Sequence, residues 1–257
     1  MMDAAKTAPG WYGKLPSLGD FASRRLAAEF IESWDAWLGA GMAAQREALG
    51  EAWLDAYLQG PTWRFVLMPG AVPGLPAQHA LAGVLMPSVD RVGRYFPLTV
   101  ATALARLPQS AAELELLLAW LHRLEDLALD ALQDDWTIDE LEQALDQLPE
   151  LETGAAATPS TELEAAGAAL VGALASDAAF VALEGVANRT ELAALLAGAV
   201  ARATPGGWQQ AASGKAFWLA DNPLVPRLLV SNGLPGHAEF VQMLGSSGRE
   251  PGAATSF

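Results

Sequence analysis

The stretch ALAGVLMPSVDRVGRYFPLTVATAL, residues 80–104, decides the fold class. It holds two apolar runs, 80–86 and 95–104, on either side of a short connection rich in proline, glycine and charge. A third apolar run, TWRFVLM, fills residues 62–68. The Gly/Pro-rich connections are too short for a crossover helix of about ten residues or more, so the three runs are predicted to be antiparallel neighbours in a sheet.

Helical patterns and further strands flank this sheet. Apolar residues at three- and four-residue spacing predict two helices between residues 30 and 57, the second ended by Gly60 and Pro61. Hydroxyl residues with glutamate three positions later predict helices that begin at Ser110 and Thr137 and run to residues 133 and 147. The remaining predicted strands cover 11–15, 179–185, 215–220 and 226–231, and the remaining predicted helices cover 162–175, 190–203 and 236–244.

These elements predict an α/β (α+β) fold. We expect a central mixed, largely antiparallel β-sheet covered by α-helices, in an arrangement similar to an α/β/α sandwich. One domain is predicted over residues 10–245, with a possible loop or linker at 153–161. Residues 1–9 and 246–257 are predicted to be disordered, because chain ends rich in small and polar residues seldom pack.

Composition excludes several kinds of chemistry. The 257 residues include no cysteine, which rules out disulfides, thiolate nucleophiles and cysteine-bound metals. No apolar run is long enough to cross a bilayer, and the first residues lack the apolar segment of a secretion signal. We therefore expect a cytoplasmic protein that does not insert into a membrane.

The net charge of −15 is concentrated in one part of the chain. Residues 1–106 carry nine basic and nine acidic residues, whereas residues 107–257 carry six and twenty-one. Such an acidic field repels nucleic acid, so nucleic-acid binding is not expected. The most acidic stretch, 113–164, is interpreted as a solvated helical face, with a basic partner docking there as the alternative.

Motifs for catalysis, metals and phosphate loops are missing. The three histidines, His79, His122 and His237, show no spacing typical of a metal site. His122 is expected to have a structural or surface role, because it lies one turn before Asp126 on the polar side of its helix. No GxSxG motif is present. The segment GKLPS differs from a phosphate loop because Leu15 and a proline follow the lysine. No cofactor and no metal are predicted.

Two segments combine charge with turn residues. The first, GWYGKLPSLGDFASRR, covers residues 10–25, and its turn is predicted to lead directly into a helix that Asp20 can cap. In the second, MPSVDRVGRYFP at 86–97, Asp90 lies between two hydrophobic strands with Arg91 and Arg94. Three interpretations remain open for this cluster: an Asp-Arg pair that braces the connection, two arginines that hold an anionic group of a partner, or a catalytic site.

Six segments of the chain resemble the TagF family of bacterial proteins associated with the type VI secretion system. They are GWYGKLPSLGDF, WDAWL, YLQGPTWRFVL, GVLMPSVDRVGRYFPLT, KAFWLA and NGLPGHAEF. The resemblance is densest over residues 10–105 and extends thinly to residue 244. It implies an α/β fold and a cytosolic regulator that restrains the secretion system after translation, in association with the forkhead-associated scaffold protein of that system. It implies no catalytic residue.

The sequence therefore predicts a non-enzymatic regulator that represses type VI secretion by binding the forkhead-associated scaffold protein. The residues predicted to contact this partner, or to hold the contact surface in shape, are Lys14, Asp20, Arg24, Asp90, Arg91 and Arg94. Two alternatives remain. One is a hydrolase that acts on a phosphorylated or acidic substrate through Asp90, Arg91 and Arg94, and the other is a structural adaptor that docks through the acidic region 113–164.

Overall fold

The three apolar runs within residues 62–104 form adjacent antiparallel strands, as predicted: β3 (Trp63–Leu67), β4 (Ala80–Met86) and β5 (Leu98–Leu104). The computed structural model describes residues 8–75, 79–108, 111–151, 180–183, 207–221 and 227–245. Five more strands extend the sheet: β1 (Gly10–Gly13), β2 (Ala22–Arg24), β6 (Phe180–Leu183), β7 (Lys215–Ala220) and β8 (Arg227–Asn232). The eight strands form one sheet in the order β2-β1-β5-β4-β3-β7-β8-β6.

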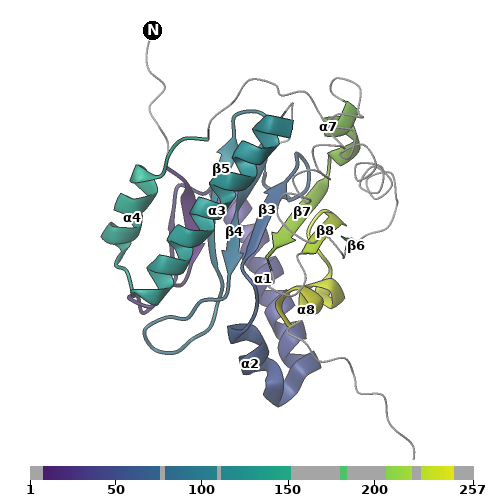
Figure 1. Cartoon of the computed structure of the whole chain (residues 1–257). Helices are drawn as coiled ribbons and strands as arrows, with labels where there is room; N and C mark the ends of the chain where they lie inside the picture. The colour runs from purple at the N-terminus through teal and green to yellow at the C-terminus, as the bar shows by residue number, and fades with distance from the viewer. Residues whose placement is uncertain are drawn as a thin grey trace, which may run out of the picture.

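Helices cover both faces of this sheet (Figure 1). One face carries α3 (Ala111–Gln133) and α4 (Ile138–Gln147). The other carries α1 (Ala28–Leu49), the 3-10 turn η1 (Gly50–Ala52), α2 (Trp53–Leu58) and α8 (His237–Gly245), and a short α7 (Gly207–Ala212) precedes β7. The predicted α+β class is confirmed. Every pairing among the described strands is antiparallel, so these strands show no parallel component of the mixed sheet that was expected.

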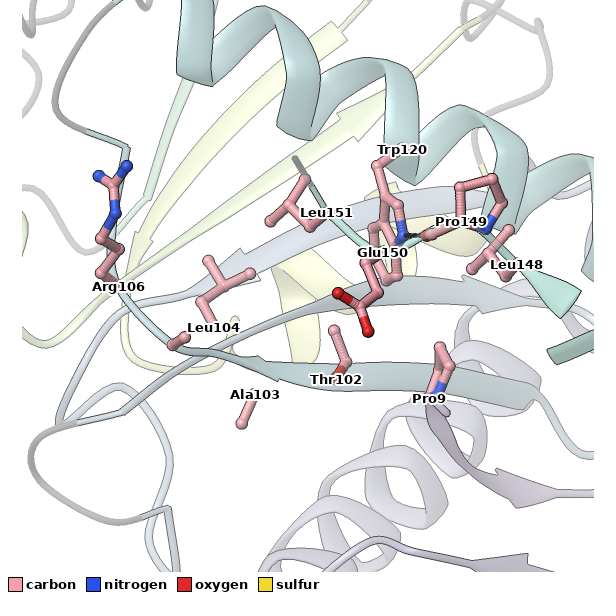
Figure 2. A pocket seen from close by; sticks show the side chains of 11 residues that line it. Pro9, Thr102, Ala103, Leu104, Arg106, Trp120, Leu148, Pro149, Glu150 and Leu151 are labelled. Atoms are coloured by element: carbon pink, nitrogen blue, oxygen red, sulfur yellow. Dashed lines mark hydrogen bonds between the residues drawn. The ribbon is translucent and has the colours of Figure 1, made fainter. Parts of the chain in front are cut away.

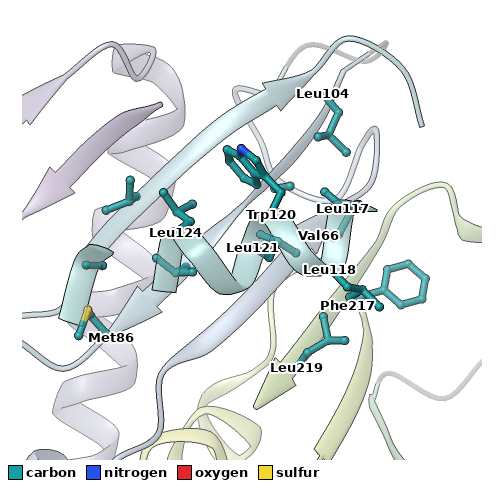
Figure 3. Packing of buried hydrophobic residues seen from close by; sticks show 14 of the residues in the cluster. Val66, Met86, Leu104, Leu117, Leu118, Trp120, Leu121, Leu124, Phe217 and Leu219 are labelled. Atoms are coloured by element: carbon teal, nitrogen blue, oxygen red, sulfur yellow. The ribbon is translucent and has the colours of Figure 1, made fainter. Parts of the chain in front are cut away.

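Alternation along β4 explains why the sheet has two apolar faces. Successive side chains of a strand point to opposite faces. Ala82, Val84 and Met86 therefore pack on the face that α3 covers, while Leu81 and Leu85 pack on the face that α1 covers. Figure 3 shows the first of these cores, where leucines of α3 lie against side chains of the sheet. Because both faces are buried, strand β4 is apolar along its whole length.

Aromatic side chains fill the core on the α1 face. Trp34 and Trp37 of α1 pack on Trp218 of β7, with ring centroids 6.1 and 5.4 Å away. Phe65 of β3 lies 5.3 Å from Trp34 and 5.6 Å from Trp218. The apolar spacing that predicted α1 therefore identifies the residues that join the strands of the two halves of the chain.

The structure corrects the sequence analysis at the N-terminal end of the domain. A short strand, β2, pairs with β1 and separates the turn from α1, so Asp20 caps no helix and its side chain accepts the Phe21 N–H instead. Ala8 and Pro9, which fall in the stretch predicted to be disordered, are buried, and the Arg25 guanidinium donates to both of their carbonyl groups. The predictions for Ser110, for residues 153–175, 190–203 and 246–257, and for 1–7 lie outside the described residues.

The capping box at the start of α4 is confirmed and gives a first testable prediction. The Thr137 hydroxyl accepts the Glu140 N–H, and the Glu140 carboxylate accepts the Thr137 N–H. Thr137→Ala is expected to lower the free energy of unfolding by about 1 kcal/mol in urea denaturation, because it leaves an N–H at the helix end without an acceptor. Thr137→Ser keeps the hydroxyl and should retain most of the stability, so an equal loss in both variants would contradict this role.

Candidate functional site

The two charged segments found in the sequence lie against each other. The connection between β1 and β2, residues 14–21, and the connection between β4 and β5, residues 87–97, are joined by hydrogen bonds, and we call them the paired loops. The Ser88 hydroxyl donates to the Lys14 carbonyl at 2.7 Å, and the Arg91 N–H donates to the Leu18 carbonyl at 2.8 Å. The Arg94 guanidinium donates to the Gly19 carbonyl. The β4–β5 connection extends beyond the ends of its strands in Figure 1.

Asp90 is the centre of the paired loops. Its carboxylate accepts the Lys14 ammonium at 2.8 Å, Arg94 Nε at 2.7 Å, and the N–H groups of Val92 and Arg94 at 3.0 and 2.8 Å. The side chains of Lys14 and Asp90 are only 5% and 0% exposed. Burial alone would raise the pKa of Asp90, but the hydrogen bonds from Lys14, Arg94 and the backbone outweigh it and hold this pKa well below its usual range. Asp90 is therefore a brace that is charged at neutral pH.

The base of the β4–β5 connection is fixed to α2. The buried Tyr57 hydroxyl donates to the Ser88 carbonyl at 2.9 Å and accepts the Ser88 N–H at 2.9 Å. Burial raises the pKa of Tyr57 above its usual range, so the phenol keeps its proton. Above this anchor, Val89 and Tyr95 form an antiparallel bridge, and Gly93 closes the tip with φ = +81°, where a side chain would be strained.

The structure separates the six predicted site residues into two groups. Lys14 and Asp90 are buried in the brace and do not reach the surface. Asp20, Arg24, Arg91 and Arg94 are exposed around it. Arg94 belongs to both groups, since its Nε bonds Asp90 while its side chain remains 54% exposed. The bracing interpretation therefore accounts for Lys14 and Asp90, and only the other four are able to touch a partner.

An exposed aromatic ring, missed by the sequence analysis, adjoins these charges. Phe21 is 45% exposed. Its ring stacks on Tyr12 at a centroid distance of 6.0 Å and meets the edge of Phe96 at 4.8 Å, and Lys14 Nζ lies 4.9 Å from its centroid. Phe21 follows Gly19 and Asp20 in the sequence, but this order does not indicate that the ring reaches solvent.

A second charged cluster, also missed, lies under α3. Arg64 of β3 is 1% exposed, and its guanidinium lies 2.8 Å from an Asp221 carboxylate oxygen and 3.5 Å from Glu125 Oε2. His122 Nδ1 lies 3.1 Å from Arg64 Nη1 and 3.2 Å from Glu125 Oε2. His122 thus takes part in a largely buried network, which is the structural one of its two expected roles, and its side chain is 26% exposed. An arginine inside the apolar run WRFVL was the available signal, because a buried cation requires anionic partners.

Two cavities adjoin strand β5, and neither contains a predicted site residue. The smaller has a volume of about 240 Å³. In Figure 2, Trp120 and Leu151 lie on one side of it and Leu104 and Thr102 of β5 on the other, and the Trp120 Nε1–H donates to the Pro149 carbonyl. The larger, of about 400 Å³, lies on the other face between β5 and the start of α1, and its polar lining includes Arg25 and His79. Both linings are mostly apolar.

Other features of the described ranges bear on function in a limited way. Within them, no three His, Asp or Glu side chains converge as a metal site would require. None of the helices described combines the length and hydropathy needed to span a bilayer.

Comparison with known proteins supports the fold and identifies the family of the chain. The chain is a protein associated with the type VI secretion system. Within that class it belongs to the TagF family, because the family description "TagF N-terminal domain, Type VI secretion system-associated" matches residues 10–148, which include both paired loops. The crystal structure of PA0076 from Pseudomonas aeruginosa PAO1 is similar over 97% of this chain and 100% of its own, with 31% identity and a TM-score of 0.61. A search of curated proteins gives no match.

Proposed function

We propose that this protein is a non-enzymatic regulator of the type VI secretion system, which represses its assembly or activity after translation by binding the forkhead-associated scaffold protein in the cytoplasm. Membership of the TagF family supports a role in this secretion system. The observation that carries the binding function is the state of Asp90, whose carboxylate accepts four hydrogen bonds inside a buried brace. A carboxylate with four hydrogen bonds inside a buried brace holds the surrounding loop surface in shape, which is what a binding function requires.

The hydrolase alternative is less well supported. A catalytic base needs a pKa near the working pH and access to substrate. Asp90 has a pKa far below that range and no exposed side-chain surface. Activity against generic phosphate esters and carboxylic esters, with divalent metals added and abolished by Asp90→Asn, would restore the hydrolase function.

The proposal is tested by binding and by secretion. The purified full-length chain is expected to form a saturable complex with the forkhead-associated scaffold protein in calorimetry, and overproduction is expected to reduce type VI secretion. A chain that neither binds this scaffold protein nor changes secretion would overturn the proposal.

The acidic-adaptor alternative has its own variant. Asp130, Asp134 and Asp139 are exposed on or near α3 and α4, outside the capping box. Replacing all three by asparagine removes three negative charges without touching the paired loops. If the triple variant binds as the unmodified chain does, docking through these acidic helices is excluded. If it loses binding, this alternative replaces the paired loops as the docking region.

A further inference from the structure

We infer that the tip of the β4–β5 connection, residues 91–94, is a preformed knob that enters a concave, acidic surface of the partner, one lined by aspartate and glutamate carboxylates. This inference rests on the proposed function and specifies the chemistry of the partner. Val92 marks the knob. Its side chain is 64% exposed, more than any other large apolar side chain that the structure describes.

The knob is held rigidly although it lies in solvent. The N–H groups of Val92 and Arg94 bond the buried Asp90 carboxylate, the Gly93 N–H bonds the Asp90 carbonyl at 3.0 Å, and the Arg91 N–H bonds the neighbouring loop. Binding normally loses affinity through the ordering of loops and side chains. A tip whose backbone is already fixed avoids much of that loss. The rigid, exposed Arg-Val-Gly-Arg sequence is therefore suited to binding a partner protein.

Charge selects an acidic partner. The chain carries a net charge of −15, so its field repels anionic surfaces in general. At the tip, however, Arg91 and Arg94 are both exposed, and none of the ion pairs among the described residues includes the Arg91 guanidinium. Arginine binds carboxylates through two parallel hydrogen bonds. A partner with carboxylates around a depression is therefore attracted to this tip and repelled by the acidic part of the chain, which favours one orientation.

The order of residues in the knob predicts an apolar centre in the partner's surface. The exposed valine lies between two arginines in the sequence, and an acidic rim around an apolar floor matches that order. Central apolar contacts surrounded by polar ones are typical of protein interfaces. Phe21, which is 45% exposed and packs against Phe96 of the β4–β5 connection, lies next to this connection.

The test uses the full-length chain and the full-length scaffold protein. Arg91→Glu and Val92→Asp are each expected to weaken binding by about tenfold or more, because they place a negative charge against an acidic surface. Their Tm should stay within about 2 °C of the unmodified chain, since both side chains are exposed and their backbone hydrogen bonds remain. Matched controls are Arg123→Glu on α3 and Leu58→Asp on α2, which change the same chemistry at other exposed positions.

Each outcome of this test either supports or overturns the inference. If the unmodified chain binds and all four variants bind equally well, the knob is wrong while the proposed function stands. If the unmodified chain does not bind the scaffold protein, the knob inference and the proposed function are both wrong. Restoration of Arg91→Glu binding by a carboxylate-to-lysine change on the scaffold protein would support direct pairing. Loss of binding after phosphatase treatment of the scaffold protein would overturn the inference in favour of a phosphate group. Arg91→Ala and Val92→Ser repeat the test with smaller changes if either first variant unfolds.

Discussion

Replacement of Asp90 by alanine is expected to lower the Tm by about 10 °C, because it leaves the buried Lys14 ammonium without its anion. The same change removes the acceptor of the Val92 and Arg94 N–H groups, so the β4–β5 connection loses its internal support. Differential scanning calorimetry of the purified chain measures this effect. A Tm within 2 or 3 °C of the unmodified protein, roughly the effect of one kcal/mol, would show that the brace contributes little.

The double variant Lys14→Met and Asp90→Asn is the matched control. It removes both charges at once while keeping side chains of similar size, so no unpaired ion remains in the interior. We expect its Tm to lie above that of Asp90→Ala. A double variant less stable than the single one would mean that the ion pair itself is not the stabilising element.

The pH dependence of this brace follows from the direction of the pKa shift. Because the pKa of Asp90 is lower in the folded protein than its ordinary value of 3.8, its contribution to stability is complete well above pH 3.8 and declines as the pH falls toward the folded pKa. The Tm advantage of the unmodified chain over Asp90→Asn should therefore be smaller at pH 3 than at pH 7. An advantage that grows on acidification would contradict this sign.

Replacement of Arg64 by leucine is expected to lower the free energy of unfolding by about 3 kcal/mol at pH 7. The guanidinium is buried between the sheet and α3, and its loss leaves the Glu125 carboxylate, itself only 12% exposed, without a cation 3.5 Å away. Burial raises the pKa of Glu125 and Arg64 opposes that rise, so the variant should raise this pKa further. Urea denaturation measures the change.

The sign of the pH effect is opposite to that at Asp90. A carboxyl group whose folded pKa lies above its unfolded pKa favours the folded state at low pH, and this advantage is lost as the pH rises through the folded pKa. Arg64→Leu should therefore be more destabilising at pH 8 than at pH 5. The control is Arg64→Leu with Glu125→Leu, which replaces the cation and its more buried anionic partner by apolar groups. It should recover most of the stability, because the remaining partner, Asp221, is 36% exposed and reaches solvent. Failure to recover would show that packing of the arginine stem is responsible.

Much of the fold was predictable because local sequence and final environment agree. Strands β4 and β7 have the predicted bounds, since each is buried along its whole length and, apart from Lys215, apolar. Strand β2 was not predictable. Its three residues, ASR, have no strong strand preference, and they form a strand only because the edge of β1 lies beside them.

The residues of the candidate site were predictable from the sequence, but which of them are buried and which are exposed was not. Lys14, Asp90 and Arg94 were selected because charged residues are crowded into the two loop-rich segments that carry the family resemblance, and functional residues often lie on loops. The sequence does not show how exposed a side chain in a loop is, so the buried Lys14 and the exposed Arg91 could not be distinguished. The Arg64 cluster joins residues from β3, α3 and the segment after β7, and only the three-dimensional fold brings such distant residues together.

The position of β7 between β3 and β8 has a consequence for biosynthesis. Strand β3 ends at Leu67, whereas its neighbour β7 begins at Lys215, so the growing polypeptide leaves the ribosome with one edge of β3 unpaired and Phe65 uncovered by Trp218. At usual elongation rates this interval lasts on the order of ten seconds. Nascent chains in that interval expose a hydrophobic strand edge, so we expect them to engage chaperones until the C-terminal third has been translated.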